Sequence, residues 1–504
     1  MKLKKEQIQL SLIRMHSKYP PISIVWLKRD LRLDDHEAIC SALNSNNKVL
    51  LLYVAENTMK KHSHFSERHL NFIRESLKDM NNKLIEKNTK ILAVEGELIS
   101  VFEELRKIFF IKGVYSHFET GIKLTFERDL DFKKWMTSEQ ITWHEYRQQG
   151  VFRGLKNRDN WSELWEKFMR QPQKKIPKNA NFLNKAVISK ISTEFKLLNL
   201  NTSVNSKIQI GGSSQANRYL ETFFKGRYLN YQNHISKPDL SRKSCSRLSP
   251  YISYGNISMR QVIQRTEKEK NKGKNGFGIR AFESRLRWQS HFIQKFEMEC
   301  SMEFESVNKG YHEIIKPLNY KYIDAWEKGK TGIPLVDASM RCLVQTGYLN
   351  FRMRALVVSF FVHHLWQPWQ ACSAFLAKQF LDFEPGIHFP QIQMQAGETG
   401  INTLRIYNPV KNGLEHDPFG NFTKQWIPEL STLPEKLVHT PWNITTLEAE
   451  IYNFKIGYNY PYPIVDIQKS RKFASETLWR MQKKSTVQEE SKRILKQHTF
   501  NEKR

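Results

Sequence analysis

The sequence predicts two regions of different class: an α/β domain with a doubly wound parallel sheet, then an all-α domain. Short β-rich runs alternate with helical stretches from residue 22 to about residue 148. From residue 216 to about Pro409 β-rich runs are few, and most of the chain reads as helices. A polar, weakly periodic stretch lies between the two. Because strands separated by helices favour parallel pairing, the first region is expected to carry helices on both faces of its sheet.

The elements of the first region follow one another in a regular order. Strands are expected at residues 22–30, 48–56, 90–97, 113–119 and 141–148, and helices at 34–43, 66–88, 99–109 and 125–139. In such sheets, ligands bind beyond the carboxyl ends of the strands. No GxGxxG or P-loop motif follows any of these strands, so a plain dinucleotide or nucleoside-triphosphate site is not supported.

The chain divides into four segments. Residues 20–165 form the α/β domain, 166–215 a polar connector, 216–468 the helical domain, and 469–504 a charged C-terminal segment. The last segment is helical in pattern, and it fits either a packed terminal helix or a loose basic tail.

The charge balance points to a polyanionic partner. The 504 residues include 79 Lys+Arg and 51 Asp+Glu, which gives a formal net charge of +28. Such an excess suits nucleic acid or an acidic membrane surface, although a Lys-rich composition with solvated helix faces would produce it too. A hydrophobic share of 40% with 12% aromatic residues excludes a disordered basic tail protein.

The sequence also bears on the compartment. No apolar run approaches the roughly 18–20 residues of a membrane helix, and the basic first 21 residues lack the apolar core of a secretory signal. The five cysteines are far apart, without a CxxC motif, which speaks against a disulfide framework or a zinc knuckle. We therefore expect a cytoplasmic protein, with no membrane partner and no metal site.

Four motifs occur in a fixed order along the chain. They are WLKRDLRLDDHEAI (Trp26–Ile39), SRLSPYISYGNIS (Ser246–Ser258), the GKTGIPLVDASMRCLVQTGYLNFRMR run (Gly329–Arg354) and RIYNPV (Arg405–Val410). In these motifs the sequence resembles the photolyase/cryptochrome flavoproteins over roughly residues 22–465. The resemblance implies an α/β antenna domain, a long connector and a helical domain that holds FAD.

The resemblance places the FAD site on particular residues. The Ser246–Ser249 turn before a helix suits the pyrophosphate, and an ordinary Ser-capped helix is the alternative. Arg354 and Asp382 fall where the family pairs an Arg with an Asp beside the flavin ring, and a purely structural ion pair is the alternative. The cofactor-binding residues expected by resemblance are Tyr231, Ser246, Arg247, Leu248, Ser249, Arg354, Asp382, Glu384, His388 and Asn408.

Several positions depart from the family pattern. Arg285 stands where cyclobutane-dimer photolyases have Glu, three residues before a dimer-stacking Trp, and Phe351 replaces the Asn or His of its motif. His388 stands where the family has a ring-facing Asn, Asp or Cys. It either faces the flavin as a proton or hydrogen-bond donor, or it is a core histidine bonded to a backbone carbonyl.

The electron route also departs from the pattern. Ile392 and Met394 replace two family Trp residues, so the innermost Trp of the usual photoreduction chain is missing. Trp369 matches the next Trp outward, and Trp366 or Tyr407 offers another route. We assign electron transfer to Trp369 and Trp366.

A lesion pocket is expected beside the flavin. Trp288 offers a stacking face for a base, with core packing as its alternative reading. Arg285 would stabilise developing negative charge, so Arg285 and His388 are the candidate catalytic residues. The candidate DNA-binding residues are Trp288, Arg352 and Met394.

The sequence leaves a second chromophore undecided. The stretch Ser116–Asp129 lies at the expected carboxyl end of a strand, where a folate or deazaflavin would bind. Plain helix and loop chemistry explains the same residues.

Two main functions fit these observations. The first is a light-driven DNA photolyase, a lyase that acts as a monomer on UV-made pyrimidine dimers, with single-stranded DNA as one candidate substrate. The second is a cryptochrome-like blue-light photoreceptor, which the missing Glu, Asn and Trp residues favour. A nucleic-acid-binding flavoprotein without photochemistry is a weaker third alternative.

Overall fold

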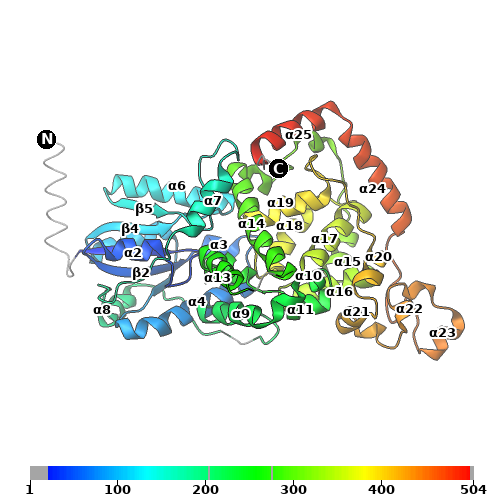
Figure 1. Ribbon diagram of the computed structural model, residues 1–504, viewed down its shortest axis with the longest axis horizontal. Coiled ribbons are helices and arrows are strands. Elements are labelled where there is room, and N and C mark those ends of the chain that lie inside the picture. Colours follow the sequence, from blue (N-terminus) through cyan, green and yellow to red (C-terminus); the bar gives the residue numbers. More distant parts are fainter. Residues whose placement is uncertain (1–20, 203–204, 274–275, 500–504) are drawn as a thin grey trace.

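The computed structural model describes residues 21–202, 205–273 and 276–499. The first 20 residues, which enter the argument about a secretory signal, lie outside the described residues. Figure 1 shows the α/β region at one end of the molecule and the helical region at the other.

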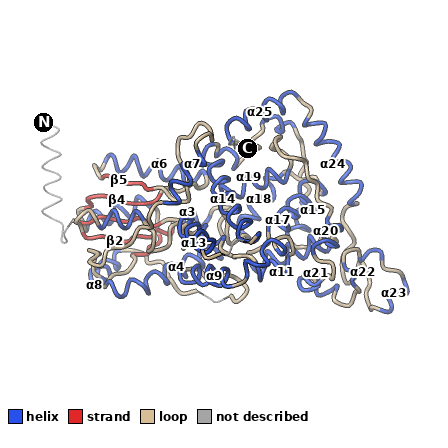
Figure 2. Tube along the Cα trace, viewed as in Figure 1, coloured by secondary structure: helices blue, strands red, loops and turns tan. Residues whose placement is uncertain are grey.

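A five-stranded, fully parallel sheet forms the first region, which confirms the predicted fold class. Its order is β3-β2-β1-β4-β5, so the chain winds outward from the central β1 in both directions. The strands gather in one compact block in Figure 2. Their bounds are β1 Ile22–Leu27, β2 Lys48–Ala55, β3 Leu92–Glu95, β4 Ile111–His117 and β5 Thr142–Tyr146. Buried side chains on both faces explain the continuous apolar runs of β1 and β2.

Helices cover both faces of this sheet. On one face Ile24 and Trp26 pack in a core with Phe102 and Phe132 from two helices of the region. The other face contributes alternate residues of the same strand to a different core. The helices are α2 Glu37–Leu43, α3 Asn57–Lys61, α4 Glu67–Leu84, α5 Leu98–Ile108 and α6 Lys123–Ser138.

The two regions share a hydrophobic core rather than meeting at a polar boundary. Val25 and Leu51 of the sheet belong to the same cluster of buried residues as Ile252 and Phe282 of the helical region. Polar contacts join two of the sequence motifs across this boundary. Ser258 Oγ donates to Asp35 Oδ2 at 2.6 Å, and Arg260 Nη1, just beyond the motif, lies 2.9 Å from Asp35 Oδ1. These motif residues therefore hold the regions together.

The connector is packed against the sheet. It contains α8 (Lys185–Ile191), and Leu183 and Leu198 donate backbone hydrogen bonds to Val49 and Ala93 of the sheet. Helix α7 (Trp161–Arg170) spans the expected boundary at residues 165 and 166 and contacts α13 (Met259–Asn271) of the helical region.

The second region consists of helices throughout its described residues. The longest, α14, runs beside α19, and a Cβ on Gly386 would lie 2.7 Å from Ile293 Cα, so glycine permits this close approach. The bounds are α9 Ser213–Lys225, α10 Tyr231–His234, α11 Pro238–Ser244, α12 Ser249–Ser253, α13 Met259–Asn271, α14 Phe277–Met298, α15 Tyr320–Glu327, α16 Pro334–Thr346, α17 Phe351–Ser359, α18 Trp369–Gln379, α19 Pro385–Ala396, α20 Pro409–His416, α21 Asn421–Trp426, α22 Glu435–Val438 and α23 Thr446–Ile451.

The charged C-terminal segment forms two packed helices, α24 (Ile467–Gln482) and α25 (Ser485–His498). Leu478 and Val487 are buried against Tyr311. Figure 1 shows the pair along the outer edge of the helical region. Of the two alternatives that the sequence left open, the packed helix is confirmed.

Within the described ranges, no helix combines the length and the apolar character that crossing a bilayer requires.

Candidate functional site

The Ser246–Ser249 motif forms the turn between α11 and α12. Arg247 adopts a left-handed conformation with φ of 59°, and Ser246 Oγ accepts a hydrogen bond from the Leu248 amide at 3.4 Å. The following helix has only five residues, so its dipole contributes little to anion binding. Any affinity of this turn for a phosphate must come from hydroxyls, backbone amides and neighbouring cations.

Three arginines surround this turn. Arg227 Nη2 donates to the Tyr219 carbonyl at 2.6 Å and its Nη1 to that of Cys245, while Arg247 donates to Gln209 Oε1 at 2.7 Å. Arg242 and Arg247 lie over the ring of Tyr348. None of the three lies within 4.0 Å of a carboxylate of the described chain. Burial lowers the pKa of Arg227 and Arg242, so an anion here would relieve an existing electrostatic cost.

Sequence reasoning missed Arg227 and Arg242. They belong to other helical segments than the Ser motif, and only the fold brings them to it. A lone Arg in a charged helical stretch gives no such signal in a single sequence.

Tyr231 lies between this turn and α14. It is buried with its ring 5.8 Å from that of Phe223 and 5.9 Å from that of Phe282. Burial, which outweighs the opposing effect of Arg285, raises the pKa of its hydroxyl. The phenol therefore stays protonated and can donate a hydrogen bond, as a phosphate-contacting Tyr must.

Arg354 and Asp382 form an ion pair. Arg354 Nη2 donates to both carboxylate oxygens of Asp382, at 2.9 and 2.8 Å, and its Nε donates to the Leu349 carbonyl at 2.9 Å. The structure thus brings together two residues from α17 and the loop before α19, as the sequence predicted. Contact of this pair with a flavin stays a prediction.

Glu384 faces the other region of the molecule. Its Oε2 lies 3.4 Å from Arg29 Nη2, which follows β1. Burial raises the pKa of Glu384 to about 7, although Arg29 opposes this. Arg29 also donates to the Ser253 carbonyl at 2.9 Å. Glu384 therefore takes part in the contact between the two regions.

His388 is held as a core histidine. Its Nε2 lies 3.0 Å from the Ser373 carbonyl, to which it donates, and burial lowers its pKa to about 3. The ring is neutral near pH 7, and with the proton on Nε2 its Nδ1 accepts but does not donate. The expected role of His388 as proton donor to a flavin is therefore not supported by its hydrogen bonding, and the carbonyl-bonded alternative agrees with it.

Asn408 caps a helix. Its Oδ1 accepts a hydrogen bond from the Lys411 amide at 3.0 Å at the start of α20. This bond gives Asn408 a structural role, and its expected contact with the cofactor stays a prediction.

The candidate lesion pocket lies on the exposed side of α14 and α17. Trp288 is 45% exposed and Phe351 46%, so core packing does not explain Trp288. Arg285, three residues before Trp288 and on the same face of α14, has its guanidinium 5.7 Å from the Phe351 ring. Arg285 has no carboxylate partner among the described residues.

The other two expected DNA-binding residues are half-buried. Arg352 Nη1 donates to the Tyr407 hydroxyl at 3.4 Å, while its buried Nε has no partner in the described chain. Met394 lies on α19. No contact in the structure joins Met394 to Trp288, so its place in this pocket stays a prediction.

Of the two expected electron-transfer residues, Trp369 is buried and Trp366 is partly exposed. Trp369 Nε1 donates to Ser306 Oγ at 2.9 Å. Trp366 contacts Phe473 of α24 edge-on at 4.9 Å between ring centroids, and Lys316 Nζ lies 4.9 Å from its ring. The two indoles therefore lie in different electrostatic surroundings.

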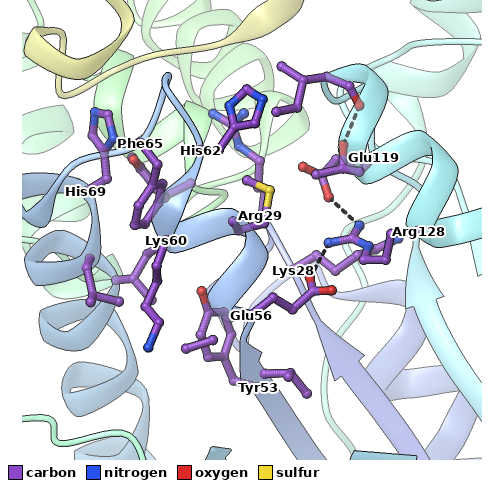
Figure 3. A pocket seen from close by; sticks show the side chains of 18 of the residues that line it. Lys28, Arg29, Tyr53, Glu56, Lys60, His62, Phe65, His69, Glu119 and Arg128 are labelled. Carbon is purple, nitrogen blue, oxygen red and sulfur yellow. Dashed lines mark hydrogen bonds and ion pairs between the residues drawn. The ribbon is translucent and has the colours of Figure 1, made fainter. Parts of the chain in front are cut away.

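A cavity of about 110 Å³ lies between the two regions, at the carboxyl ends of the strands. A single water needs only about 10–15 Å³, so a larger molecule fits. The expected antenna stretch lines it through Glu119, Ile122, Thr125 and Arg128, and Tyr254 and Phe383 contribute from the helical side. Figure 3 shows Lys28, Arg29, Tyr53 and Arg128 around this space.

The charges lining this cavity are internally paired. Arg128 contacts Glu56 at 2.7 Å, Asp129 at 2.8 Å and Glu119 at 3.2 Å, and two of these pairs are marked in Figure 3. Lys28 Nζ lies 3.1 Å from Asp129. Burial raises the pKa of Asp129, but Lys28 and Arg128 outweigh it and hold that pKa below its usual value. The walls therefore offer aromatic surface rather than unpaired charge.

A buried cluster of Asp30, His36 and His117 has the ligand types of a metal site. His117 Nδ1 lies 2.8 Å from Asp30 Oδ2, and His36 Nε2 lies 3.1 Å from the same oxygen. However, His36 Nδ1 accepts a hydrogen bond from the Ile39 amide, which places the proton of the neutral ring on Nε2. With its proton on Nε2, His36 cannot offer that nitrogen as a metal ligand, while His117 is hydrogen-bonded to the Asp30 carboxylate.

Comparison with known families agrees with both regions. Residues 23–156 match the model described as "DNA photolyase", and residues 282–480 match the "FAD binding domain of DNA photolyase". The chain belongs to the photolyase/cryptochrome family. The resemblance inferred from the four motifs is thereby confirmed.

Curated relatives include both kinds of family member. The chain is 29% identical to a deoxyribodipyrimidine photo-lyase of Alkalihalophilus pseudofirmus over 52% of this chain and 54% of the relative. It is 32% identical to cryptochrome-1 of Arabidopsis thaliana over 54% of this chain and 40% of the relative. The chain thus spans about half the length, or less, of these relatives, and family membership alone does not separate repair from signalling.

Solved structures confirm the fold over nearly the whole chain. A Synechocystis cryptochrome matches with a TM-score of 0.83 and 21% identity, covering 91% of this chain and 99% of that one. A bacterial class III photolyase from Agrobacterium tumefaciens matches with a TM-score of 0.80 and 22% identity, covering 93% and 99%.

The residues of this chain fit a bound FAD. A dinucleotide brings a pyrophosphate, and the Ser246–Ser249 turn is surrounded by three guanidiniums that no described carboxylate neutralises. The Arg354–Asp382 pair lies in the same helical region and would contribute charged groups beside a flavin. Arg227, Arg242 and Arg247 would thus hold the phosphates.

Proposed function

We propose that this protein is a light-driven, FAD-dependent DNA photolyase that repairs UV-made pyrimidine dimers. The observation that carries the proposal is the exposed group of Trp288, Arg285 and Phe351 on the FAD-binding region. The Trp288 indole contacts His291 and Phe292 on one side only and leaves almost half of its surface exposed, beside a guanidinium that no described carboxylate pairs. This group has the chemistry that binds an unstacked base and its phosphate.

Each residue has a separate task in this proposal. Bound FAD supplies light absorption and a transferable electron. Trp288 stacks on the damaged bases, a contact that contributes about 1–3 kcal/mol in single-stranded binders. Arg285 is a fixed cation that stabilises negative charge as it develops on the dimer. It replaces the carboxylic acid that cyclobutane-dimer photolyases have at this position.

The overall charge supports DNA as the partner. A net charge of +28 favours binding of a polyanion and makes its affinity salt-dependent. The base must leave the stack to reach Trp288, and this costs least in single-stranded DNA, so we propose a preference for that substrate.

Lesion repair under blue light tests the function. UV-irradiated oligothymidylate, as a single strand or in a duplex, is mixed with the FAD-loaded protein and a reductant, then illuminated or kept dark. We expect the dimers to disappear only under light, faster in the single strand. Lesions that persist in both substrates while the flavin is photoreduced would favour a receptor.

Two variants test the site itself. Trp288→Ala is expected to weaken binding to irradiated single-stranded DNA by about 5- to 150-fold, the equivalent of 1–3 kcal/mol, with FAD retained. Trp479→Ala on α24 is the matched control, because Trp479 is 50% exposed and lies far along the chain from this pocket. Equal loss in both variants would remove Trp288 from the lesion pocket.

A cryptochrome-like photoreceptor is the second candidate. The observation that favours it is His388, since its neutral, carbonyl-bonded ring is an unusual occupant of the position that the family reserves for a ring-facing residue. A flavin that photoreduces normally without any dimer repair would support this alternative.

We also propose that the cavity between the two regions holds a second, planar chromophore. Its walls carry Tyr53, Phe65, Tyr254 and Phe383, and its charges are already paired. A photolyase structure from Sulfolobus tokodaii, 22% identical, is described as holding two FAD molecules, with a novel light-harvesting cofactor implied. A folate, a deazaflavin or a second flavin each has the required planar ring.

Cavity filling tests the second chromophore. Ala55→Trp places an indole in the cavity and is expected to abolish the second absorption band of the purified protein, while one FAD per chain remains. Lys61→Trp on the exposed side of α3 is the control. A second band that survives Ala55→Trp would place the chromophore elsewhere.

The remaining proposals concern location and assembly. All five cysteines are free, which agrees with a reducing, cytoplasmic location.

We propose a monomer, because the lesion pocket is formed by α14 and α17 of one chain. Sedimentation at micromolar concentration tests this, and a stable dimer would contradict it.

A further inference from the structure

A continuous line of hydrogen bonds leads from the buried Trp369 indole to a carboxylate. Trp369 Nε1 donates to Ser306 Oγ at 2.9 Å, and Ser306 Oγ donates to Glu398 Oε2 at 2.6 Å. All three side chains are buried. Ser306 therefore connects an indole N–H directly to a largely buried carboxylate.

The acceptor is held by a buried cation. Lys316 Nζ donates to the other oxygen, Glu398 Oε1, at 2.8 Å, with both side chains less than a tenth exposed. Burying two charges costs several kcal/mol per ion, and the mutual attraction of the pair often does not repay it. A pair kept at such a cost beside Trp369 calls for a role other than stability.

The same cation distinguishes the two candidate electron donors. Lys316 Nζ lies 4.9 Å from the Trp366 ring, and a positive charge there opposes the formation of a radical cation on that indole. Trp369 instead donates its N–H toward the negative partner of the pair. Its oxidation is therefore favoured over that of Trp366.

We propose that Ser306 and Glu398 form a proton relay for Trp369, so that its oxidation is coupled to loss of the indole proton. Trp369 gives up one electron, for which a bound, oxidised FAD excited by light would be the acceptor. The Nε1 proton of the resulting radical cation passes to Ser306 Oγ, while the Ser306 hydroxyl proton passes to Glu398 Oε2. The products are a neutral indole radical, an intact Ser306 hydroxyl and a protonated Glu398. This relay rests on the proposed function, because it needs a flavin that light can reduce.

Loss of the indole proton would slow the return of the electron to Trp369. An electron returns readily to an indole radical cation, whereas return to the neutral radical also requires the proton to come back. Deprotonation through Ser306 would therefore prolong charge separation. It offers a way for this chain to keep photoreduction efficient without the missing innermost Trp.

Transient absorption after a blue flash on the FAD-loaded, oxidised protein tests the relay. The cation and neutral radicals of indole absorb at different wavelengths, so the deprotonation rate is read directly. We expect a rapid conversion to the neutral radical that slows in D₂O. In Ser306→Ala the conversion is expected to be slower by about 100-fold, the lower end of the range for positioned proton transfer.

A charge-balanced pair of variants separates the relay from folding. Glu398→Gln combined with Lys316→Met leaves an amide oxygen that accepts the Ser306 hydrogen bond but not its proton, and leaves no unpaired buried charge. It is expected to slow deprotonation as Ser306→Ala does. Glu313→Gln combined with Lys484→Met removes an exposed pair as control and is expected to leave the rate unchanged.

Two results would overturn the relay, and they are distinguishable. If Trp369→Phe removes the radical signal but Ser306→Ala leaves its conversion unchanged, the proton leaves by another path. If Trp369→Phe leaves the signal and the flavin reduction unchanged, Trp369 is not the donor and the relay is wrong, while dimer repair is unaffected. Loss of repair with a normal relay would instead contradict only the proposed DNA function.

Discussion

Two groups of basic side chains in this molecule are compensated in opposite ways. At the cavity between the regions, Arg128 contacts the carboxylates of Glu56, Glu119 and Asp129. Lys28 contacts the other oxygen of Asp129. At the Ser246–Ser249 turn, Arg227, Arg242 and Arg247 contact carbonyls, an amide and an aromatic ring, but no described carboxylate. The first group is complete without a ligand, whereas the second is prepared for an anion.

The difference indicates what each place can bind. A self-neutralised cluster holds its own walls in position and leaves room for a ring that carries little charge. A cluster of uncompensated cations destabilises the protein when no anion is bound, and binding of a phosphate relieves this repulsion. Variants of the two clusters should therefore separate stability from cofactor binding.

The largest effect is expected from Asp129→Ala on α6. The change leaves Lys28 without its partner and weakens the buried network of Arg128, so the free energy of unfolding should fall by about 3–4 kcal/mol. Urea denaturation of the FAD-loaded protein measures this. Asp131→Ala is the matched control on the same helix, because Asp131 pairs with Lys134 at an exposed position, and its change should stay below about 1 kcal/mol. Equal losses would show that the cluster does not support the region.

A smaller effect, on FAD affinity instead of stability, is expected from Arg247→Ala. Removing a cation that no described carboxylate compensates should lower FAD affinity by about 1.5–3 kcal/mol, or tenfold or more, with little loss of stability in the FAD-free chain. Fluorescence titration of the FAD-free chain with FAD measures the affinity. Arg480→Ala, on the exposed side of α24, is the control. A stability loss like that of Asp129→Ala, with unchanged FAD affinity, would contradict the proposed pyrophosphate site.

The effect expected to be smallest over the pH range measured below is that of a buried histidine. Burial lowers the pKa of His363 to about 3, so its neutral ring contributes stability that is present above pH 6.5 and lost as the pH falls toward 3. Its contribution should decline by about 1.4 kcal/mol per pH unit over that window. Thermal unfolding at pH 7.5, 6.5 and 5.5 measures the slope, and His363→Asn should flatten it. An unchanged slope would show that His363 does not titrate as its burial requires.

The sequence predicted the sheet because β-rich runs alternate with helical stretches. All five strands were found. The central strands are buried apolar runs, whereas the edge strand β5 is largely exposed and was predicted from its place after a helix. The boundary at residue 165 is less sharp in the structure, because α7 continues across it and packs on α13. Local composition does not show which neighbour a helix will contact.

The candidate site could be predicted only where motif residues meet one another. Arg354 and Asp382 pair as expected, whereas His388 is turned toward the Ser373 carbonyl by hydrogen bonding that no motif records. Ser306 and Glu398 lie 92 residues apart, and neither belongs to a motif. Such contacts depend on how helices pack, and a single sequence carries no signal for them.

The most direct test of the central proposal is the light dependence of dimer loss. UV-irradiated single-stranded oligothymidylate, the FAD-loaded protein and a reductant are incubated in blue light and in darkness, and the remaining dimers are counted. We expect their number to fall only in the light, and to fall far more slowly with Trp288→Ala than with Trp479→Ala. Equal numbers of dimers in light and darkness, with the flavin fully reduced, would contradict the repair function.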